Sequence, residues 1–373
     1  MQYTWEQRKL GNLVTIERGG SPRPIDAYIT EAPDGLNWVK IGDAPEQGRY
    51  ITHTKEKIKL SGLSKTRQVF PGDLILSNSM SFGKPYIMGI YGCIHDGWLL
   101  IRNNQNAFDL KFLCHMLGTE QMLMQYRQLA AGSTVNNLNK ELVSNADINV
   151  PDKVEQEKIG AFLELVDNAI TLHQRKYEKL LKIKKSMLEN MFPKNGEMKP
   201  RIRFKGFTDD WEQCKFEDVV EIKSGMDYKN LSEGDIPVYG TGGYMLSVDG
   251  ALSEDKDAIG IGRKGTIDKP YKLRAPFWTV DTLFYCIPKA DLDLDFINCL
   301  FQNVDWKEKD ESTGVPSLSK VIINNVDTAI PLFFEQKKIG HYFSNIDHLI
   351  TLHQRKLEKL KKLKNSMLEN MFA

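Results

Sequence analysis

Two short stretches contain residues whose types and spacing could carry chemistry. Residues 221–223 read Glu-Ile-Lys, and a carboxylate beside a lysine could belong to a metal-dependent nuclease. A bare Glu-x-Lys is common by chance, however, and the corresponding residues 15–17 of an internal repeat read Thr-Ile-Glu. Residues 260–265 read Gly-Ile-Gly-Arg-Lys-Gly, which superficially resembles a phosphate-binding loop. The run lacks the Gly-Lys-Ser/Thr ending, so we expect a turn between strands that presents Arg263 and Lys264.

The cysteine and histidine residues form no standard metal or redox motif. Cys93-x-His95 and Cys114-His115 could bind zinc, but their spacing fits no common ligand pattern, and Asn298 aligns with Cys114 in the repeat. The five cysteines are an odd number without a CxxC pair, which indicates free thiols in a reducing cytosol. An amino-methyltransferase would need a glycine-rich cofactor loop and an Asn-Pro-Pro-aromatic motif, and neither occurs. We therefore expect no catalytic residue, no metal and no cofactor in this chain.

The dominant feature of the sequence is a stretch that occurs twice. Residues 155–192 are repeated at 335–372, and the blocks ITLHQRK and SMLENMF recur without a change. In each copy apolar residues alternate at spacings of four and three, which is typical of a coiled-coil seam. Neither helix can bury this stripe alone, so the pattern predicts two long helices that pair with each other. The predicted seam comprises Ile159, Leu163, Val166, Ile170, His173, Tyr177 and Leu180 in the first helix and Ile339, Phe343, Ile346, Ile350, His353, Leu357 and Leu360 in the second.

Four polar residues interrupt the seam. His173 and His353 occupy equivalent positions, as do Lys184 and Lys364. They could be ligands or catalytic groups, or they could fix the register of the two helices, with the lysines reaching a polar rim. Two isolated polar sites suit registry better than a catalytic set, so we predict the structural role. The exposed positions of the first helix are basic, which is typical of a solvated face and near DNA would help to neutralise phosphates.

Bulk composition limits the classes of protein to which the chain can belong. Its 373 residues predict two or more domains, and 41% hydrophobic residues are enough to fill their cores. The net charge of +1 points to neither acidic nor basic partners. No signal peptide, targeting segment or apolar run of spanning length is present, so we expect a soluble cytoplasmic protein without a membrane partner.

The duplication extends beyond the helices. Trp5-Glu6-Gln7 recurs as Trp211-Glu212-Gln213, and each copy starts a segment of short strand-like runs between turns, followed by a helical stretch. This pattern predicts one α+β sub-fold that is used twice, each time leading into a long helix. The predicted parts are a first globule at 1–152, a helix at 153–193, a linker at 194–208, a second globule at 209–332 and a helix at 333–373.

This layout resembles the specificity subunit of type I restriction–modification systems, in which two variable target-recognition domains alternate with two conserved helical regions. The match rests on Glu-Gln-x-Lys-Ile at 155–159 and 335–339, the two repeated blocks, the Trp-Glu-Gln starts and the Ile-Pro end of the second globule. Each motif is weak alone, but their duplicated order is specific and covers essentially the whole chain. One departure is that no counterpart of the lead-in at 201–207 precedes Trp5. We expect this to remove an arm rather than the fold.

The resemblance implies a fold and a function. The fold would be α+β, with two tandem α/β target-recognition domains separated by two long helices that pair as an antiparallel coiled coil with pseudo-two-fold symmetry. Each domain would read one half of a bipartite target in double-stranded DNA, and the helices would set the spacing and dock two methyltransferase subunits. Those partners would carry S-adenosylmethionine and methylate adenine N6, and motor-nuclease restriction subunits would cut unmodified DNA. The chain itself would have no catalytic activity.

Two alternatives remain open at this point. A coiled-coil scaffold whose globules bind peptides or other ligands would show no salt-dependent DNA affinity. A metal nuclease would cleave DNA alone with Mg²⁺ and lose that activity in a Glu221→Ala variant.

Candidate DNA-contacting residues are polar or cationic side chains in turns, where a rigid scaffold can present them. Arginine and lysine can bind guanine and asparagine can pair with adenine, although phosphate contact or plain exposure explains such residues equally well. The Ser-Thr pairs at 133–134 and 312–313 are weaker candidates. The selected residues are Arg23, Ser77, Asn78, Ser79 and Lys84 in the first globule and Lys229, Tyr239, Tyr244, Arg263 and Lys264 in the second.

Overall fold

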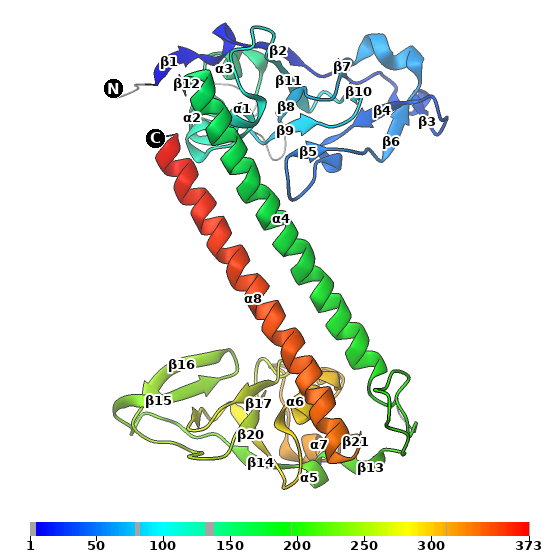
Figure 1. Cartoon of the computed structure of the whole chain (residues 1–373), viewed down its shortest axis with the longest axis vertical. Helices are drawn as coiled ribbons and strands as arrows, with labels where there is room; N and C mark the ends of the chain where they lie inside the picture. The colour runs from blue at the N-terminus through cyan, green and yellow to red at the C-terminus, as the bar shows by residue number, and fades with distance from the viewer. Residues whose placement is uncertain (1–4, 79–82, 131–137, 195, 311, 373) are drawn as a thin grey trace. The chain divides into compact units, whose positions relative to one another are not determined.

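The computed structural model describes residues 5–78, 83–130, 138–194, 196–310 and 312–372. The chain divides into two compact units, of which unit 1 consists of residues 1–175 and 354–373 and unit 2 of residues 176–353. Each unit combines a globule of helices and strands with parts of two long helices, α4 (Lys153–Asn190) and α8 (Phe333–Met371) (Figure 1). The predicted α+β class, with tandem globules and two long helices, is confirmed.

The described part of the unit 1 globule contains two five-stranded sheets. One has the strand order β2-β11-β8-β9-β5 and the other β3-β6-β4-β10-β7. A separate antiparallel pair joins β1 (Glu6–Lys9) to β12 (Asp147–Val150), so the chain enters and leaves the globule side by side. The first sheet comprises β2 (Thr15–Arg18), β5 (Tyr50–Ile51), β8 (Leu74–Ser77), β9 (Pro85–Met88) and β11 (Trp98–Arg102); the second comprises β3 (Ile29–Thr30), β4 (Leu36–Val39), β6 (Glu56–Ile58), β7 (Arg67–Val69) and β10 (Gly92–Ile94); the helices are α1 (Leu110–Leu117), α2 (Glu120–Ala130) and α3 (Lys140–Ser144).

Strand β8 is buried on both faces, in keeping with its apolar sequence. Leu74 and Leu76 lie in one core cluster with Phe112 of α1. Ile75 faces the other way and joins a second cluster with Trp98. Because successive side chains of a strand point to opposite faces, one strand serves two cores. Strand β8 therefore packs into both of these core clusters of the globule.

The unit 2 globule repeats this plan with fewer strands. Its main sheet has the order β14-β20-β17-β18, and β16-β15-β19 forms a smaller sheet. The antiparallel pair of β13 (Glu212–Lys215) with β21 (Asp327–Ile330) matches the pair of β1 with β12. The remaining elements are β14 (Val220–Ser224), β15 (Glu233–Gly240), β16 (Gly243–Val248), β17 (Ala258–Gly262), β18 (Tyr271–Leu273), β19 (Trp278–Thr279), β20 (Leu283–Pro288), α5 (Phe216–Val219), α6 (Leu294–Asn303) and α7 (Lys320–Asn324).

The start of each long helix is attached to its globule by a buried glutamine. The Gln156 Oε1 accepts from the Asp109 N–H (2.8 Å), and its Nε2 donates to the Pro151 carbonyl (3.0 Å). Gln336 makes the same pair of bonds in unit 2, to the Asp293 N–H (3.2 Å) and the Pro331 carbonyl (2.9 Å). Buried amide groups need such partners, so the repeated Glu-Gln motif is explained by this junction.

A glycine follows one turn later in each long helix, where a short helix of the globule lies close to it. A Cβ added to Gly160 would lie 2.7 Å from the Phe112 nitrogen, and one added to Gly340 would lie 2.8 Å from the Phe296 nitrogen. Both nitrogens belong to the first turn of a short helix, α1 or α6. Only glycine lets the short helix abut the long one at this distance.

The glutamate of the repeated motif is bound differently in the two units. In unit 2, Arg203 of the lead-in segment donates from Nε and Nη2 to both carboxylate oxygens of Glu335, each at 2.7 Å. In unit 1, the Trp5 Nε1 donates to the Glu155 Oε1 (3.2 Å). The segment at 201–207 thus adds a bidentate ion pair in unit 2, whereas the corresponding glutamate of unit 1 is bound by Trp5.

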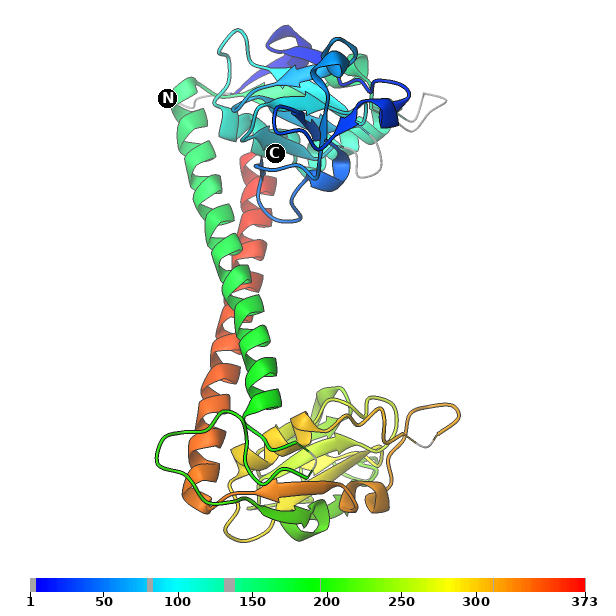
Figure 2. The same ribbon diagram turned by 90° about the vertical axis from the view of Figure 1, so that its right-hand side faces the viewer.

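The repeated block SMLENMF ends each long helix in a globular core. Phe372 packs against Trp5 in unit 1, and Phe192 packs against Trp211 in unit 2, with ring centroids 5.8 Å apart in both cases. Helix α4 therefore gives its first half to unit 1 and its last residues to the core of unit 2, and α8 does the reverse (Figure 2).

Within each unit the two helices run antiparallel and are joined by an ion pair. The Lys364 Nζ binds Asp167 in unit 1, and the Lys184 Nζ lies 2.6 Å from the Asp347 Oδ1 in unit 2. Since Lys184 and Lys364 are equivalent in the repeat, as are Asp167 and Asp347, the same pair forms twice with the helices exchanged. These contacts support a registering role for the two lysines.

Of the fourteen predicted seam residues, eight are buried and six are half-buried. The buried seam residues are Ile159, Leu163, Val166, Ile170, Ile339, Phe343, Ile346 and Leu357, and the half-buried ones are His173, Tyr177, Leu180, Ile350, His353 and Leu360.

No helix in the described ranges combines the length and apolar character that crossing a bilayer requires.

Candidate nucleic-acid interface

The candidates of the first globule gather at the end of β8. The Ser77 N–H donates to the Lys84 carbonyl (3.0 Å), and the Ser77 Oγ accepts from the Lys84 N–H (3.0 Å). The Asn78 Nδ2 donates to the Asp96 carbonyl (3.0 Å). Arg23 reaches the same residue, with its Nη2 3.7 Å from the Asp96 Oδ2. The structure thus brings four of the predicted residues into one neighbourhood.

Only part of this neighbourhood faces solvent. Arg23 and Lys84 are exposed, whereas the side chains of Ser77 and Asn78 are 1% and 3% exposed. A side chain that contacts DNA has to present its polar atoms at the surface. Burial therefore favours a structural role for Ser77 and Asn78, and the structure does not support their predicted contact with DNA. Ser79 lies outside the described residues.

Arg263 holds the position in unit 2 that Asn78 holds in unit 1. The Arg263 N–H donates to the Thr282 carbonyl (2.8 Å), and its own carbonyl accepts from the Leu318 N–H (2.9 Å). Asn78 makes the same two backbone bonds with the corresponding residues of unit 1, at 2.9 and 3.1 Å. The side chains differ, since Asn78 is buried and Arg263 is exposed. The same backbone arrangement therefore carries a buried amide in unit 1 and an exposed guanidinium in unit 2.

Arg263 and Lys264 line a cleft of about 470 Å³. Lys320 of α7 joins them from the opposite side, and the cleft also contains Ser312 of the weaker Ser-Thr candidate at 312–313. Sequence reasoning missed Lys320, although its place just after that pair could have indicated it. The other pair, at 133–134, lies outside the described residues.

The remaining candidates of the second globule lie on or near the β15–β16 hairpin. Tyr244 is well exposed, and its ring centroid is 6.3 Å from that of Tyr239. The Tyr239 ring in turn lies 6.1 Å from that of Tyr271, so the tyrosines form a row. Lys229 is exposed but paired with Asp227 at 3.1 Å. Contact of these residues with DNA remains a prediction. They lie on or near β15 and β16, whereas Arg263 directly follows β17.

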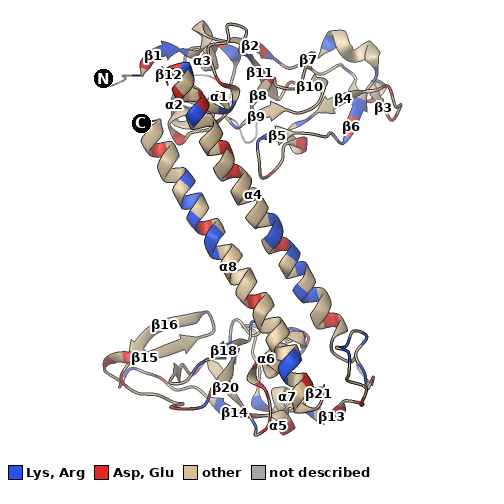
Figure 3. Ribbon diagram, in the orientation of Figure 1, with Lys and Arg blue, Asp and Glu red and all other residues tan. Residues whose placement is uncertain are grey.

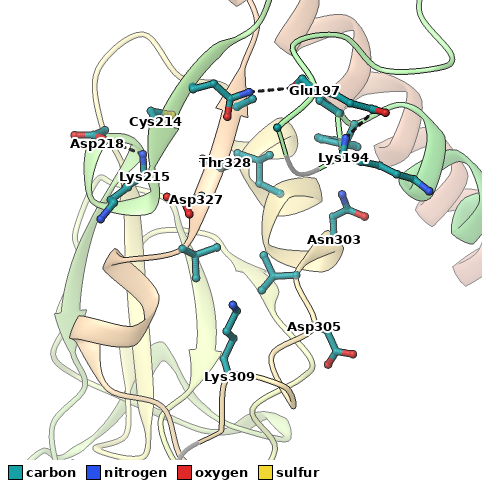
Figure 4. Close-up of a pocket in the computed structure, with 18 of the residues that line it drawn as sticks. Lys194, Glu197, Cys214, Lys215, Asp218, Asn303, Asp305, Lys309, Asp327 and Thr328 are labelled. Carbon is teal, nitrogen blue, oxygen red and sulfur yellow. Dashed lines mark hydrogen bonds between the residues drawn. The ribbon is translucent and has the colours of Figure 1, made fainter.

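A larger cleft of about 890 Å³ lies beside β21, and acidic side chains outnumber basic ones in its lining (Figure 4). The cleft therefore does not favour an anion. Its charged lining residues are Lys194, Lys215, Lys309, Glu197, Asp218, Asp305, Glu308 and Asp327. In unit 1 the corresponding strand edge is occupied by α2.

The bonds that hold α2 there come from one glutamine. The Gln125 side chain donates to the Asp147 carbonyl (2.9 Å) and accepts from the Asp147 N–H (3.0 Å). The larger cleft of unit 2 thus lies where the longer unit 1 globule has helix α2.

Basic residues also line the long helices within each unit. Figure 3 shows lysine and arginine along the second half of both α4 and α8. Such faces would add phosphate-neutralising charge next to bound DNA. The exposed residues are Lys176, Lys179, Lys182 and Lys185 in unit 2 and Arg355, Lys356, Lys359, Lys361 and Lys362 in unit 1.

The residues considered for metal chemistry form other contacts or lie in separate parts of the core. The Lys223 Nζ lies 3.6 Å from the Glu221 Oε1, so these two side chains pair with each other. The His115 Nε2 faces the Asp167 Oδ2 at 3.1 Å, while Cys93 is buried in β10 in a separate core cluster. In the described residues, no group of three or more histidine, cysteine, aspartate or glutamate side chains is arranged to hold a metal ion.

The most strongly perturbed carboxyl group lies at the junction of the helices with unit 1. Asp167 binds His115, Lys364 and the Arg49 Nε, the last at 3.1 Å. Burial opposes its ionisation, but the hydrogen bonds from His115 and Lys364 and the nearby positive charges outweigh burial and hold the Asp167 pKa well below its usual range. The cluster joins α1, α4, α8 and the segment before β5, which indicates a structural junction.

Comparison with known proteins agrees with this duplicated architecture. The family model of the type I restriction modification DNA specificity domain matches residues 2–182 and 208–362. The chain belongs to this family. The two matched ranges each hold one globule and most of the adjoining long helix, as the motif-based resemblance predicted.

Curated relatives of this specificity family extend over nearly the whole chain. The type I restriction enzyme MjaVIII specificity subunit of Methanocaldococcus jannaschii is 21% identical over 410 residues, covering 98% of this chain and 91% of the relative. The putative MjaX specificity subunit of the same organism is 22% identical, with coverages of 98% and 92%.

Solved structures show the same fold. The type I restriction–modification S subunit from M. genitalium superposes with a TM-score of 0.74 at 18% identity, covering 100% of this chain and 97% of that one. A chain from a structure of an assembled type I restriction–modification system gives a TM-score of 0.51 at 16% identity, with coverages of 99% and 97%.

Proposed function

We propose that this chain is the DNA-recognition subunit of a type I restriction–modification complex and that each unit reads one half of a bipartite duplex target. The observation that carries the proposal is the equivalent position at the ends of β8 and β17. Asn78 and Arg263 make the same two backbone bonds, but the Asn78 side chain is buried and the Arg263 side chain is exposed, so the shared backbone presents different surface groups in the two units. One scaffold with different surrounding side chains suits two half-sites of different sequence.

The proposal places the chemistry in partner subunits. Methyltransferase subunits would carry S-adenosylmethionine and transfer the methyl group to adenine N6, and motor-nuclease subunits would cut unmodified DNA. This chain would then act in the cytoplasm as the part of the complex that chooses the site, without a catalytic residue of its own.

An exposed apolar row on each long helix supports docking of two identical partners. Phe162, Leu165 and Leu172 lie on one face of α4 within unit 1, and all three are exposed. Their spacing follows the helical repeat, and the face differs from the buried seam. In unit 2, Leu349 and Leu352 are exposed on α8, and Leu352 is the equivalent of Leu172 in the repeat. Because each long helix has an exposed apolar face that includes this equivalent leucine, one type of partner, such as a methyltransferase, would dock on each unit.

A double charge in the row on α4 is expected to remove one of the two partners. The variant Leu165→Asp with Leu172→Asp would bury carboxylates against an apolar surface, which is unfavourable without a partner charge. Native mass spectrometry should then show one methyltransferase per chain rather than two. The Leu349→Asp with Leu352→Asp variant should give the same stoichiometry, and all four changes together should give none.

The matched control keeps the apolar surface. Leu165→Met with Leu172→Met should retain two methyltransferases, since methionine preserves the buried area. Two bound partners in the aspartate variant of α4 would rule out docking on this row.

Exchange of one globule tests the proposed division of the target. Residues 1–150 are replaced with the corresponding domain of another specificity subunit, and methylation is mapped across the genome of cells that also express the methyltransferase. Only one half of the methylated sequence should change, because unit 2 still reads the other half. An unchanged target, or a change in both halves, would contradict the proposal.

Salt dependence separates this function from that of a scaffold without DNA binding. The complex should bind its target less tightly as salt rises, with a slope set by the number of phosphates it contacts. Gel-shift titrations at graded salt check this, and no DNA affinity at low salt would favour the scaffold.

A further inference from the structure

The cleft beside Arg263 collects positive charge and hydroxyl groups. Among the residues that the structure describes, no carboxylate lines it. The Arg263 guanidinium carbon and the Lys320 Nζ each lie 5.9 Å from the centroid of the Phe284 ring, so both cations converge on the same side chain. Lys264 completes a set of three cations, and the hydroxyl groups come from Ser224, Ser312, Ser317 and Ser319.

The walls of the cleft are held by backbone bonds. Lys264 forms an antiparallel bridge with Ser317, and the Gly265 N–H donates to the Pro316 carbonyl (2.9 Å). Gly265 has a φ of +89°, a conformation that glycine adopts without strain. The turn after β17 and the segment before α7 are therefore fixed against each other before any ligand binds.

Among the described residues of the adjoining loop, the Asp310 carboxylate is bound within the loop itself. The Asp310 Oδ1 accepts from the N–H groups of Ser312 and Ser317, each at 3.0 Å. These backbone hydrogen bonds lower the Asp310 pKa, so the carboxylate stays ionised and engaged. It organises the loop and leaves the three cations of the cleft without a lining carboxylate partner in the described structure.

We propose that this cleft binds one phosphate of the DNA backbone next to the half-site read by unit 2, with Lys264 and Lys320 as its charged contacts. The proposal rests on the proposed function, in which unit 2 binds DNA. A base edge presents a pattern of neutral donors and acceptors that one side chain can satisfy. Three cations and several hydroxyls around one hollow suit a group with a formal negative charge instead.

The phosphate assignment has a different signature from base recognition. A lost phosphate contact weakens binding to all sequences alike and reduces the salt slope, whereas a lost base contact relaxes specificity at one position. The test therefore uses Lys264→Ala with Lys320→Ala in the assembled complex with its methyltransferase. Affinity is measured between 50 and 300 mM salt for the target duplex and for duplexes with one changed base pair in the second half-site.

The double variant should bind the target roughly tenfold more weakly at intermediate salt, which is the effect of losing about one charge-assisted hydrogen bond. The changed duplexes should lose the same factor, so the discrimination ratio stays constant. The slope of log affinity against log salt should become shallower by about one. Ethylation of one backbone phosphate should inhibit the unaltered complex but have no further effect on the variant.

The matched control is Lys309→Ala, an exposed lysine that lines the larger cleft, where acidic residues predominate. It should change neither affinity nor slope. Thermal unfolding of each variant confirms that the fold is retained.

Three outcomes would overturn the phosphate assignment. Loss of discrimination at one base pair with an unchanged slope would identify a base contact. No change in affinity would place the cleft outside the interface. Inorganic phosphate that binds the cleft without competing with the target duplex would identify a site for free phosphate. Absence of DNA binding by the unaltered complex would instead refute the proposed function itself.

Discussion

An Asp167→Asn variant is expected to lose roughly 3–5 kcal/mol of the free energy of unfolding of unit 1, the range for removing one partner of a buried ion pair. The Asp167 carboxylate binds Arg49, His115 and Lys364, and all four side chains are largely buried. Asparagine cannot balance the guanidinium of Arg49 and the ammonium of Lys364. These two charges would then face each other with little water to screen them.

The repeat supplies a matched control for this prediction. Asp347 is the equivalent residue in unit 2, where it pairs with Lys184 at 2.6 Å and Cys299 stands in the position of His115. Asp347→Asn removes a more accessible ion pair and should cost roughly 1 kcal/mol. Urea unfolding of both variants gives the two values, and equal losses would show that the larger cluster adds nothing.

The effect of Asp167 should depend on pH in one direction. Its folded-state pKa lies below the value of about 3.9 for aspartate in an unfolded chain. The stabilisation is therefore fully present above pH 4 or so, and it is lost as the pH falls through the folded-state pKa. The difference between the unaltered chain and Asp167→Asn should be constant near neutral pH and shrink only in acid.

Replacement of Gly160 with alanine is expected to destabilise unit 1 although alanine is the better helix former. In a helix interior the change from glycine to alanine ordinarily adds about 1 kcal/mol of stability. Here the new Cβ would collide with the Asp109 Oδ1 and lie 2.7 Å from the Phe112 nitrogen. Asp109 accepts a hydrogen bond from that nitrogen at 2.8 Å and so caps α1. Overpacking together with a damaged cap should cost roughly 2–4 kcal/mol.

Two further variants separate sterics from helix propensity. Gly340→Ala should show a similar loss in unit 2, because its Cβ would meet Asp293 and Phe296 in the same way. Ala161→Gly, next to Gly160 on an exposed position, should cost only about 1 kcal/mol. Thermal or urea unfolding checks all three, and a gain in stability for Gly160→Ala would mean that α1 moves away freely.

The sequence was most informative where structure depends on local periodicity. The two long helices and their seam follow from apolar spacing, which a single helix displays without knowledge of its partner. Lys184 and Lys364 stood out because they interrupt that spacing. Their acidic partners, Asp167 and Asp347, did not, because the antiparallel register that joins them is a property of two segments far apart in the chain.

The candidate interface shows the opposite case. Asn78 looks like a polar turn residue, but its side chain is buried and donates to the carbonyl of Asp96, a residue far along the chain that the sheet brings near. Lys320 belongs to a short helix whose approach to Arg263 depends on the bond from Leu318. Gly160 gave no signal, since a single glycine in a helix is common and its close neighbour lies on α1. The surroundings of Asn78, Lys320 and Gly160 all depend on contacts between residues far apart in the chain, and no local motif indicates such contacts.

The exchange of helix ends between the units also bears on how the protein is made. Unit 2 is one continuous segment, whereas the core of unit 1 includes Phe372 near the end of the described chain. Domains generally fold during synthesis in order from the N-terminus. Here the N-terminal globule is translated first but must wait for the last turn of α8 before its core is complete. The later globule can close earlier, so synthesis order and folding order are reversed, and a nascent chain released before Phe372 would carry a finished unit 2 and an open unit 1.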